Sequence, residues 1–569
     1  MPPALARHAT AIASAAAGLA WFLVQVGPAV LDPTRVGWLM RNDWAANYLG
    51  WAFFRLAPLR LPLGTIPGYP FPVGSALAFG DSLPLVGVLL RPLSALLPVD
   101  FQYVGLWLGL CFALQGFAGA KLVKLVTDDR LLQALGGTLF ALAPPLLHRV
   151  VGPNTGHASL CAHWLILSFL WLALAPVEPD RVRPRLAVAI ALVLVSSGLH
   201  PYHVIMGVAL TGALLLRLWT VERIVGWRTA AIGSATVVGA AALGLLAFGY
   251  ILPGVVMDSG GFGFFSADAL ALVNPMGWSR IWSGLRIGNG QYEGFGYLGG
   301  GVLLLGAAAG ASAVWARGCL AGLRWRPALP ALGVSFLLAV FSLSDRITVA
   351  GEPVVRIAAY ALVPALGRAF RSSGRFLWPL HYLAVLTAIA ALAKAWSSRP
   401  RLAAIGLGLA IALQVADVRP PVPMATDDGE WARPGSDAWA AARGRYRHVA
   451  LVPPFLVTGN GPAAVECPPA FPEAYVAAAD IAYRLSATFN SAYVSRIDPA
   501  RAAAACAEMS RDLESGRLDP DTIYIVHPAY WLLFTASSAT CGALDGLPVC
   551  VDRRRRDAFG EALRLTRLE

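Results

Sequence analysis

The chain has 569 residues, of which 57% are hydrophobic and only 14% are charged, and its mean hydropathy is +0.60. This balance excludes an ordinary soluble protein and indicates a polytopic membrane protein. The formal net charge of +12 is not a sign of nucleic-acid binding, because Lys and Arg of membrane proteins collect in cytoplasmic loops and at lipid headgroups.

In chain order, the sequence predicts about eleven membrane-spanning helices. The first apolar stretch is too long for a signal-peptide core and has no convincing small-residue cleavage site, so we expect it to be retained. Several later stretches are short for a bilayer, and one pair of them also reads as a hairpin. The predicted spans are residues 9–31, 101–124, 131–147, 157–176, 185–199, 201–219, 228–252, 297–316, 328–343, 376–393 and 401–417.

The segment between the first two spans, from Leu39 to Pro98, contains four arginines and two aspartates and is broken by eight prolines. Such a segment cannot lie within hydrocarbon. It carries two amphipathic helical patterns, about Asp43 to Ala57 and about Ser82 to Leu97. Each such helix needs an apolar surface beneath one face and water on the other. We therefore predict a long first periplasmic loop, residues 32–100, with two helices lying at the membrane surface.

Basic residues recur in every second connection between the predicted spans. The positive-inside rule places these five connections and the N-terminus in the cytoplasm. The first loop and everything after Val418 then lie on the periplasmic side, together with most of the unusual polar residues. The basic residues are Lys121, Lys124 and Arg130; Arg181, Arg183 and Arg185; Arg217, Arg223 and Arg228; Arg317, Arg324 and Arg326; and Lys394, Arg399 and Arg401.

The tail, residues 420–569, is predicted to be a small soluble α/β domain that follows a transmembrane domain of residues 1–419. The stretches YRHVALVPP, DTIYIVHP and LPVCVD are typical of short buried strands, and EAYVAAADIAYRL and PARAAAACAEMSRDLES are typical of helices.

Four cysteines in the tail, Cys467, Cys506, Cys541 and Cys550, suit disulfides in an oxidising compartment. Of the three pairings that four cysteines allow, we predict Cys541 with Cys550 across a short turn, and Cys467 with Cys506. No two of these cysteines have the spacing of zinc ligands.

Two acids of the first loop are candidate functional groups. Asp43 lies at the start of the first surface helix, where it suits either the helix dipole or an ion pair with Arg41, or serves as a general base for an acceptor hydroxyl. Asp81 precedes Ser82 and Pro84 and is a natural helix cap, and a second acid there also suits orienting an acceptor or binding a divalent cation.

Cationic and imidazole side chains gather at two outer turns. Arg149 and His157 lie in RVVGPNTGHASL, and His200 lies in SSGLHPYHV. A histidine at a helix end usually bonds a backbone carbonyl, whereas a cation beside an imidazole can hold a phosphate. We treat all three residues as candidate phosphate ligands.

Three arginines in GRAFRSSGRFLWP, namely Arg368, Arg371 and Arg375, recur at i, i+3 and i+7, which on a helix places them on one face unless Gly374 breaks the turn. They suit either snorkelling to headgroups or clamping the phosphate of a lipid carrier, with Arg371 and Arg375 as the candidate ligands.

The glycine-rich loop GNGQYEGFGYLG adds Tyr292 and Glu293. No strand precedes it, so it is not a dinucleotide fingerprint. It is either a flexible turn or a contact for a saccharide or lipid headgroup, and we group Tyr292 and Glu293 with Asp81 as support for an acceptor or a metal ion.

This layout resembles the GT-C superfamily of membrane glycosyltransferases: a first helix, a long first outer loop with an acid just after the span and two surface helices, further spans and a C-terminal periplasmic domain. The motifs FGDSLPL and SSGRFLWP are also similar to those of bacterial membrane proteins of the same layout. The resemblance implies a bacterial inner-membrane enzyme with a polyprenyl-phosphate sugar as donor and Asp43 as the catalytic acid. No Trp-Trp-Asp triplet is present, which argues against an oligosaccharyltransferase.

The predicted function is therefore an inverting glycosyl transfer from a polyprenyl-phosphate sugar to a glycan, lipid or protein, without nucleic acid as partner. Its phosphate ligands would be Arg371, Arg375, Arg149, His157 and His200. No cofactor is required for certain, and the need for a divalent cation is left open. One alternative is a ligase or polymerase that uses a lipid diphosphate-linked oligosaccharide and rests on His157 or His200. The other is a transporter, for which we find no repeated halves.

Overall fold

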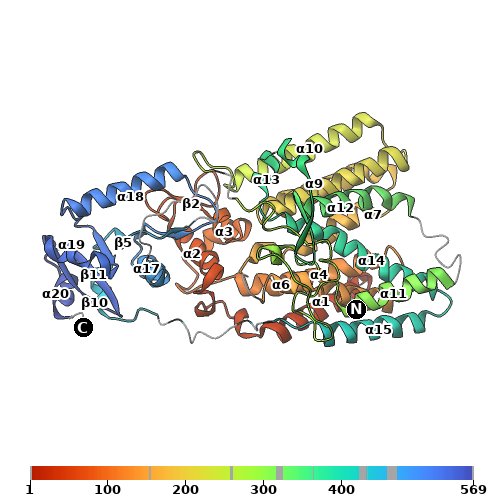
Figure 1. Cartoon of the computed structure of the whole chain (residues 1–569), viewed down its shortest axis with the longest axis horizontal. Coiled ribbons are helices and arrows are strands. Elements are labelled where there is room, and N and C mark those ends of the chain that lie inside the picture. The colour runs from red at the N-terminus through yellow and green to blue at the C-terminus, as the bar shows by residue number, and fades with distance from the viewer. Residues whose placement is uncertain are drawn as a thin grey trace. The chain divides into compact units, whose positions relative to one another are not determined.

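A computed structural model gives the structure of residues 3–152, 156–256, 260–315, 325–362, 364–421, 424, 431, 433–457 and 471–566 (Figure 1). The chain forms two compact units. The membrane unit comprises residues 1–32, 103–245 and 261–426, and the second unit comprises residues 33–102, 246–260 and 427–569. The sequence predicts two consecutive domains that meet at residue 419. In the structure, the second unit also includes the first loop, together with the tail.

The membrane unit is a bundle of helices with one small β-hairpin. Its elements are α1 (Pro3–Val26), α4 (Val104–Val123), α5 (Arg130–Ala141), α6 (Pro144–His148), α7 (His163–Leu174), α8 (Val182–Ser197), α9 (Pro201–Leu216), α10 (Trp227–Ala247), α11 (Gly300–Trp315), α12 (Leu329–Ser342), β3 (Arg346–Val349), β4 (Glu352–Arg356), α13 (Pro364–Ala369), α14 (Trp378–Ala395) and α15 (Pro400–Asp417).

Within the described part of the chain, seven helical segments are long and apolar enough to cross a membrane. Each of the eleven predicted stretches contains a helix, which confirms their helical character. The count of eleven spans stays a prediction, because several of these helices are shorter than a bilayer requires.

Small residues allow α1, α4 and α5 to pack closely. A Cβ added at Gly116 would lie 2.1 Å from the carbonyl oxygen of Ser14, and one at Gly137 would lie 2.4 Å from Ser14 Oγ. That hydroxyl donates to the carbonyl of Ala134 at 2.9 Å. Close backbone approach with a hydroxyl bond between helices is the usual way in which membrane helices associate.

The second unit contains the helices and strands of the first loop and of the tail (Figure 1, red and blue). They are α2 (Asn42–Leu56), β1 (Thr65–Ile66), β2 (Ser75–Ala76), α3 (Pro84–Leu90), α16 (Ala438–Ala442), β5 (His448–Val452), β6 (Leu456–Val457), α17 (Pro472–Arg484), β7 (Thr488–Phe489), β8 (Ala492–Tyr493), α18 (Pro499–Glu514), β9 (Thr522–Val526), α19 (Trp531–Ala536), β10 (Ala539–Leu544), β11 (Leu547–Asp552) and α20 (Ala558–Leu565).

The first predicted surface helix exists as α2, but it is not amphipathic in its burial. Every residue from Trp44 to Phe54 is buried, so the expected solvated face is absent from this helix. The reason is packing within the unit: the ring of Phe53 stacks on that of Tyr69 at 4.5 Å and lies edge-on to that of Tyr483 in α17 at 6.4 Å.

The second predicted surface helix is shorter than expected. It consists of α3 and the 3-10 helix η4 (Arg91–Leu93). The residue that caps α3 is Leu83, without a side-chain hydrogen bond, so the interpretation of Asp81 as the helix cap is wrong. Asp81 instead takes a left-handed backbone conformation, with φ of 58°, two residues before the cap.

The tail has the predicted α/β fold. Its five-stranded sheet has the order β10-β11-β9-β5-β7. The three strands β9, β5 and β7 are parallel, and β10 and β11 form an antiparallel hairpin at one edge. Alternate side chains, including Ala450, Tyr524 and Cys550, line one face and pack against Met509 of α18 and Phe534 of α19.

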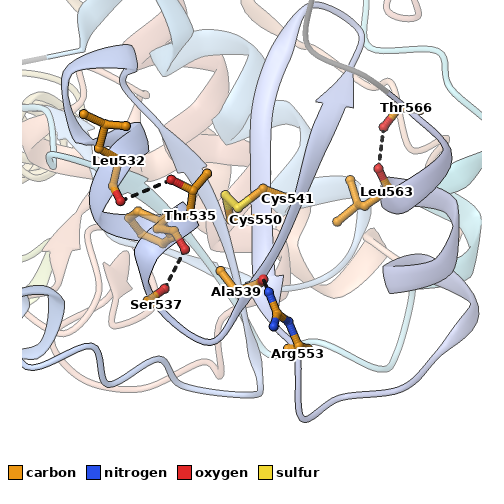
Figure 2. The surroundings of a disulfide bond; sticks show 10 residues. Leu532, Thr535, Ser537, Ala539, Cys541, Cys550, Arg553, Leu563 and Thr566 are labelled. Atoms are coloured by element: carbon orange, nitrogen blue, oxygen red, sulfur yellow. Dashed lines mark hydrogen bonds between the residues drawn. A yellow bond between two sulfur atoms is a disulfide. The ribbon is translucent and has the colours of Figure 1, made fainter.

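The hairpin carries the disulfide between Cys541 and Cys550, which are directly opposite in the strand register (Figure 2). The structure therefore contains this sequence-predicted pair. The other predicted pair includes Cys467, which lies outside the described residues.

Candidate anion site in the membrane unit

Three chain segments that are distant in sequence meet in the membrane unit. They are the turn after α6, the 3-10 helix η8 (Gln291–Gly294) in the glycine-rich loop, and the 3-10 helix η11 (Ser373–Leu377) before α14. Glycines allow their backbones to touch: a Cβ added at Gly374 would lie 2.5 Å from the Cα of Gly294. This close approach brings Glu293 beside Arg375.

The Glu293 carboxylate is held by two guanidinium groups. Arg375 donates from Nε to Oε2 at 3.0 Å and from Nη2 to Oε1 at 2.7 Å, the fork arrangement that binds carboxylates best. Arg149 donates from Nη1 to Oε2 at 2.6 Å and from Nη2 to the backbone carbonyl of Glu293 at 2.9 Å.

All three side chains are removed from solvent, with exposed fractions of 1% for Arg149, 4% for Glu293 and 6% for Arg375. Burial alone raises the pKa of the Glu293 carboxyl, but Arg375 and then Arg149 outweigh it and hold that pKa well below its usual range. With two cations and one anion, the cluster has an excess of one positive charge.

Aromatic rings support both guanidinium groups. The Cζ of Arg149 lies 5.3 Å from the ring centroid of Trp378, and that of Arg375 lies 4.9 Å from the ring centroid of Tyr202. The Tyr202 hydroxyl accepts a hydrogen bond from the backbone amide of Ser372 at 3.0 Å. These contacts link α9 and α14 to the cluster and fix the orientation of its cations.

His157 and Arg371 border the cluster and are less buried than its members. His157 Nε2 lies 4.0 Å from Glu293 Oε1, and its side chain is 23% exposed. Arg371 is half-buried, with its Cζ 5.5 Å from the ring centroid of Phe265. The buried cluster has an excess of positive charge and is bordered by the partly exposed side chains of His157 and Arg371. This arrangement is suited to attract a phosphate or another anion.

The remaining candidates of the membrane unit lie near this cluster or cap a helix. Tyr292 is half-buried, with its ring 6.2 Å from that of Phe265. His200 is the N-cap of α9, where its Nδ1 accepts from the amide of Tyr202 at 3.2 Å. Its ring centroid lies 5.3 Å from that of Tyr202, the residue beneath Arg375.

The interpretation of the arginine repeat as one helical face is wrong. The helix α13 ends at Ala369, and η11 begins only at Ser373, so Arg368 and Arg375 lie on different elements. Arg368 is exposed, whereas Arg375 is buried. The break between the two elements is residues 370–372, and Gly374, which touches the glycine-rich loop, lies in η11.

The two acids of the first loop lie in the second unit. Asp43 is in the first turn of α2 and half-buried, and its backbone carbonyl accepts from Asn47 Nδ2 at 3.0 Å. Asp81 is also half-buried. Within the described residues, no group of three or more His, Cys, Asp or Glu side chains is arranged to hold a metal ion.

Sequence reasoning singled out Arg149, Glu293 and Arg375 but did not pair them. It missed Tyr202 and Trp378, the two rings beneath the cations. A signal was present in the motifs themselves. Tyr202 comes two residues after His200, and Trp378 comes three residues after Arg375. Only packing reveals that each ring lies beneath an arginine.

The fold and the site define a helical membrane protein with a small α/β part and a buried, positively charged cluster. The chain belongs to the family described as "Domain of unknown function (DUF6311)", whose profile matches residues 15–419. The profile described as "DUF6311 C-terminal domain" matches residues 438–552.

Among solved structures, the chain is similar to the oligosaccharyltransferase of Archaeoglobus fulgidus in its apo form. The two share 12% identity with a TM-score of 0.39, and the match covers 85% of this chain and 64% of that one. The sequence matches none of the curated proteins with which it was compared.

Proposed function

We propose that this protein is an inverting membrane glycosyltransferase that moves a sugar from a polyprenyl-phosphate donor to a periplasmic glycan, lipid or protein. The observation that carries the proposal is the buried cluster of Arg149, Glu293 and Arg375, in a unit built of apolar helices. Buried ionisable groups are costly in a membrane protein and are usually kept for function.

A lipid-linked phosphate suits this cluster in charge and in location. Arg375 belongs to a helical segment that is itself a candidate span, residues 373–395, so the cluster lies at the end of an apolar helix. The excess positive charge would stabilise the phosphate as it departs with the bonding electron pair. Arg371 and His157 are proposed to contact the phosphate from the exposed border.

Asp43 is proposed as the general base. In the reaction, the acceptor hydroxyl gives its proton to the Asp43 carboxylate and its oxygen forms a bond to the anomeric carbon. The bond from that carbon to the phosphate oxygen breaks on the opposite side. One such displacement inverts the anomeric configuration and needs no covalent enzyme intermediate.

The proposal is tested with purified protein and radiolabelled bacterial lipid extract. The wild type is expected to transfer label, and Asp43→Asn to lose at least about 100-fold of the rate, the usual contribution of a general base. The control is Asp180→Asn, because that carboxylate is 71% exposed beside Arg181 and should keep full activity. Equal transfer by the wild type and Asp43→Asn would reject the base, and no transfer from any lipid-linked donor would reject the function.

A second candidate is a ligase that uses a lipid diphosphate-linked oligosaccharide with His157 as base. The position of His157 favours it, because its Nε2 lies 4.0 Å from Glu293 Oε1 and its side chain is 23% exposed at the border of the cluster. Under this alternative His157→Gln abolishes transfer and Asp43→Asn does not. Under the first proposal, the rate of transfer falls more in Asp43→Asn, and His157→Gln mainly weakens binding of the donor.

A further inference from the structure

The α/β part of the second unit carries an exposed group of arginines that the transfer reaction does not use. They come from two loops, one that precedes β5 and one that follows β11. We call this group the arginine patch. Its members are Arg443, Arg445, Arg447, Arg553, Arg554 and Arg556, all of which are exposed.

The two loops, more than 100 residues apart in sequence, are joined by Arg555. Its guanidinium donates to the backbone carbonyl of Arg445 and to the Asp521 carboxylate, and its Cζ lies 4.6 Å from the ring centroid of Tyr446. Tyr446 in turn donates to Asp557 Oδ1 at 3.3 Å. The loops are therefore fixed side by side, at the edge of the sheet where β5 and β9 begin.

The patch keeps a strong positive charge after its internal ion pairs are counted. Including Arg555, seven arginines stand against four aspartates, Asp519, Asp521, Asp552 and Asp557, which leaves a charge of +3. Three of these acids are already engaged, Asp552 by Arg554, Asp521 by Arg447 and Arg555, and Asp557 by Arg555. Arg443 and Arg556 project from opposite loops of the patch.

The surroundings favour a soluble polyanion over a lipid surface. Membrane-binding surfaces combine cations with exposed apolar side chains that enter the bilayer. The exposed large apolar side chains described in the tail are Tyr493, Leu532, Leu533 and Leu565, and none of these lies in the patch loops. In Figure 2, Arg553 lies beside Ala539 at one end of the hairpin, and Leu532 lies away from it.

The patch also lacks the features that bind single-stranded nucleic acid. Such surfaces present exposed aromatic rings on which bases stack. The one ring of the patch loops, that of Tyr446, is 3% exposed and lies beneath Arg555. Guanidinium forks alone are suited to carboxylates and phosphates carried at intervals on a polymer without planar bases.

We propose that the arginine patch binds an anionic polysaccharide that carries carboxylate or phosphate groups. This binding site goes beyond the glycosyl transfer and does not depend on it. Arg555 and Tyr446 form its rigid base, and the six exposed arginines are its ligands for the polymer.

The experiment measures binding of a fluorescent polygalacturonate oligosaccharide of about ten sugars to the full-length protein in a neutral detergent. The test variant is Arg443→Gln with Arg556→Gln, and the matched control is Arg511→Gln with Arg564→Gln, two exposed arginines outside the patch. The wild type should bind polygalacturonate, more weakly as salt rises, and should not bind neutral dextran.

The test variant is expected to bind roughly 30-fold more weakly, because two arginines at about 1 kcal/mol each near an anionic surface contribute about 2 kcal/mol together, and the control should bind like the wild type. Equal weakening in both variants, or no binding by the wild type at low salt, overturns the proposal. Tighter patch-dependent binding of single-stranded DNA or of phosphatidylglycerol vesicles overturns the choice of partner. Should the test variant misfold, the salt dependence of wild-type binding and the comparison with dextran still decide whether the protein binds the polysaccharide through its charge.

Discussion

Glu293 is the single anion between two buried cations, so its charge determines whether the cluster is stable. Removing one partner of a buried ion pair leaves an uncompensated charge in a medium that solvates it poorly. Here the loss would leave two guanidinium groups, those of Arg149 and Arg375, repelling each other.

Replacing Glu293 with Gln is therefore expected to cost about 3–5 kcal/mol of the free energy of unfolding, the range for a broken buried pair. The measurement is the thermal midpoint of the protein in detergent. Glu352→Gln is the control, because Glu352 lies exposed on β4 and should leave the midpoint unchanged. An unchanged midpoint in Glu293→Gln would mean that the carboxylate does not hold the cluster.

The same residue predicts a pH dependence. Because the pKa of Glu293 is depressed in the folded protein, its stabilising contribution is complete above the unfolded pKa of about 4.3 and is lost as pH falls toward the folded pKa. The difference in thermal midpoint between the wild type and Glu293→Gln should thus stay constant from pH 7 to about pH 5 and narrow between about pH 4.3 and pH 3. A difference that does not narrow below about pH 4.3 would contradict the depressed pKa.

At the scale of elements, the break between α13 and η11 decides which arginines can act together. A continuous helix would have aligned Arg368, Arg371 and Arg375. Instead, Arg371 lies in the connection, beside Phe265, and Arg368 is exposed on α13.

If the proposed donor site is correct, Arg371→Gln should raise the KM for the lipid donor, by about 10-fold for one charge-assisted contact of roughly 1.4 kcal/mol. Arg368→Gln should leave both KM and kcat unchanged. Initial rates of label transfer at varied donor concentration provide the measurement. Equal effects of the two substitutions would indicate that the arginines act only through general surface charge.

At the scale of the whole molecule, the second unit combines the first loop with the tail. Arg55 of α2 donates to the Tyr483 hydroxyl at 2.8 Å. Arg484 joins Asp100 of the loop to Asp480 of α17, and Asp480 is fully buried. Stability of the loop therefore depends on side chains almost 400 residues further along the chain.

Arg484→Gln is expected to destabilise this unit by roughly 2–4 kcal/mol, near the lower end for a buried pair because Arg484 is itself a quarter exposed. Limited proteolysis should then cut the segment 33–102 faster. The control is Arg517→Gln, since Arg517 is 72% exposed in its pair with Asp512 and such surface pairs contribute little. Unchanged protection of the loop in Arg484→Gln would show that the ion pair does not hold the loop.

The features that depend on local pattern were predictable from the amino-acid sequence. Apolar runs and period-two alternation predicted the helices of the bundle, the strands β5, β9 and β11, and the helices α17 and α18. Residue type singled out Arg149, Glu293 and Arg375, because charged groups beside apolar spans are conspicuous. The short turn between Cys541 and Cys550 predicted their pairing, which the structure contains.

Which of these residues meet depends on tertiary packing. The pairing of Glu293 with two arginines depends on contact between Gly294 and Gly374, which no local pattern encodes. The burial of α2 on all sides depends on packing within the second unit, so an apparently amphipathic helix is enclosed. Periodicity reports on one element at a time, whereas burial and charge pairing arise between segments that are distant in sequence.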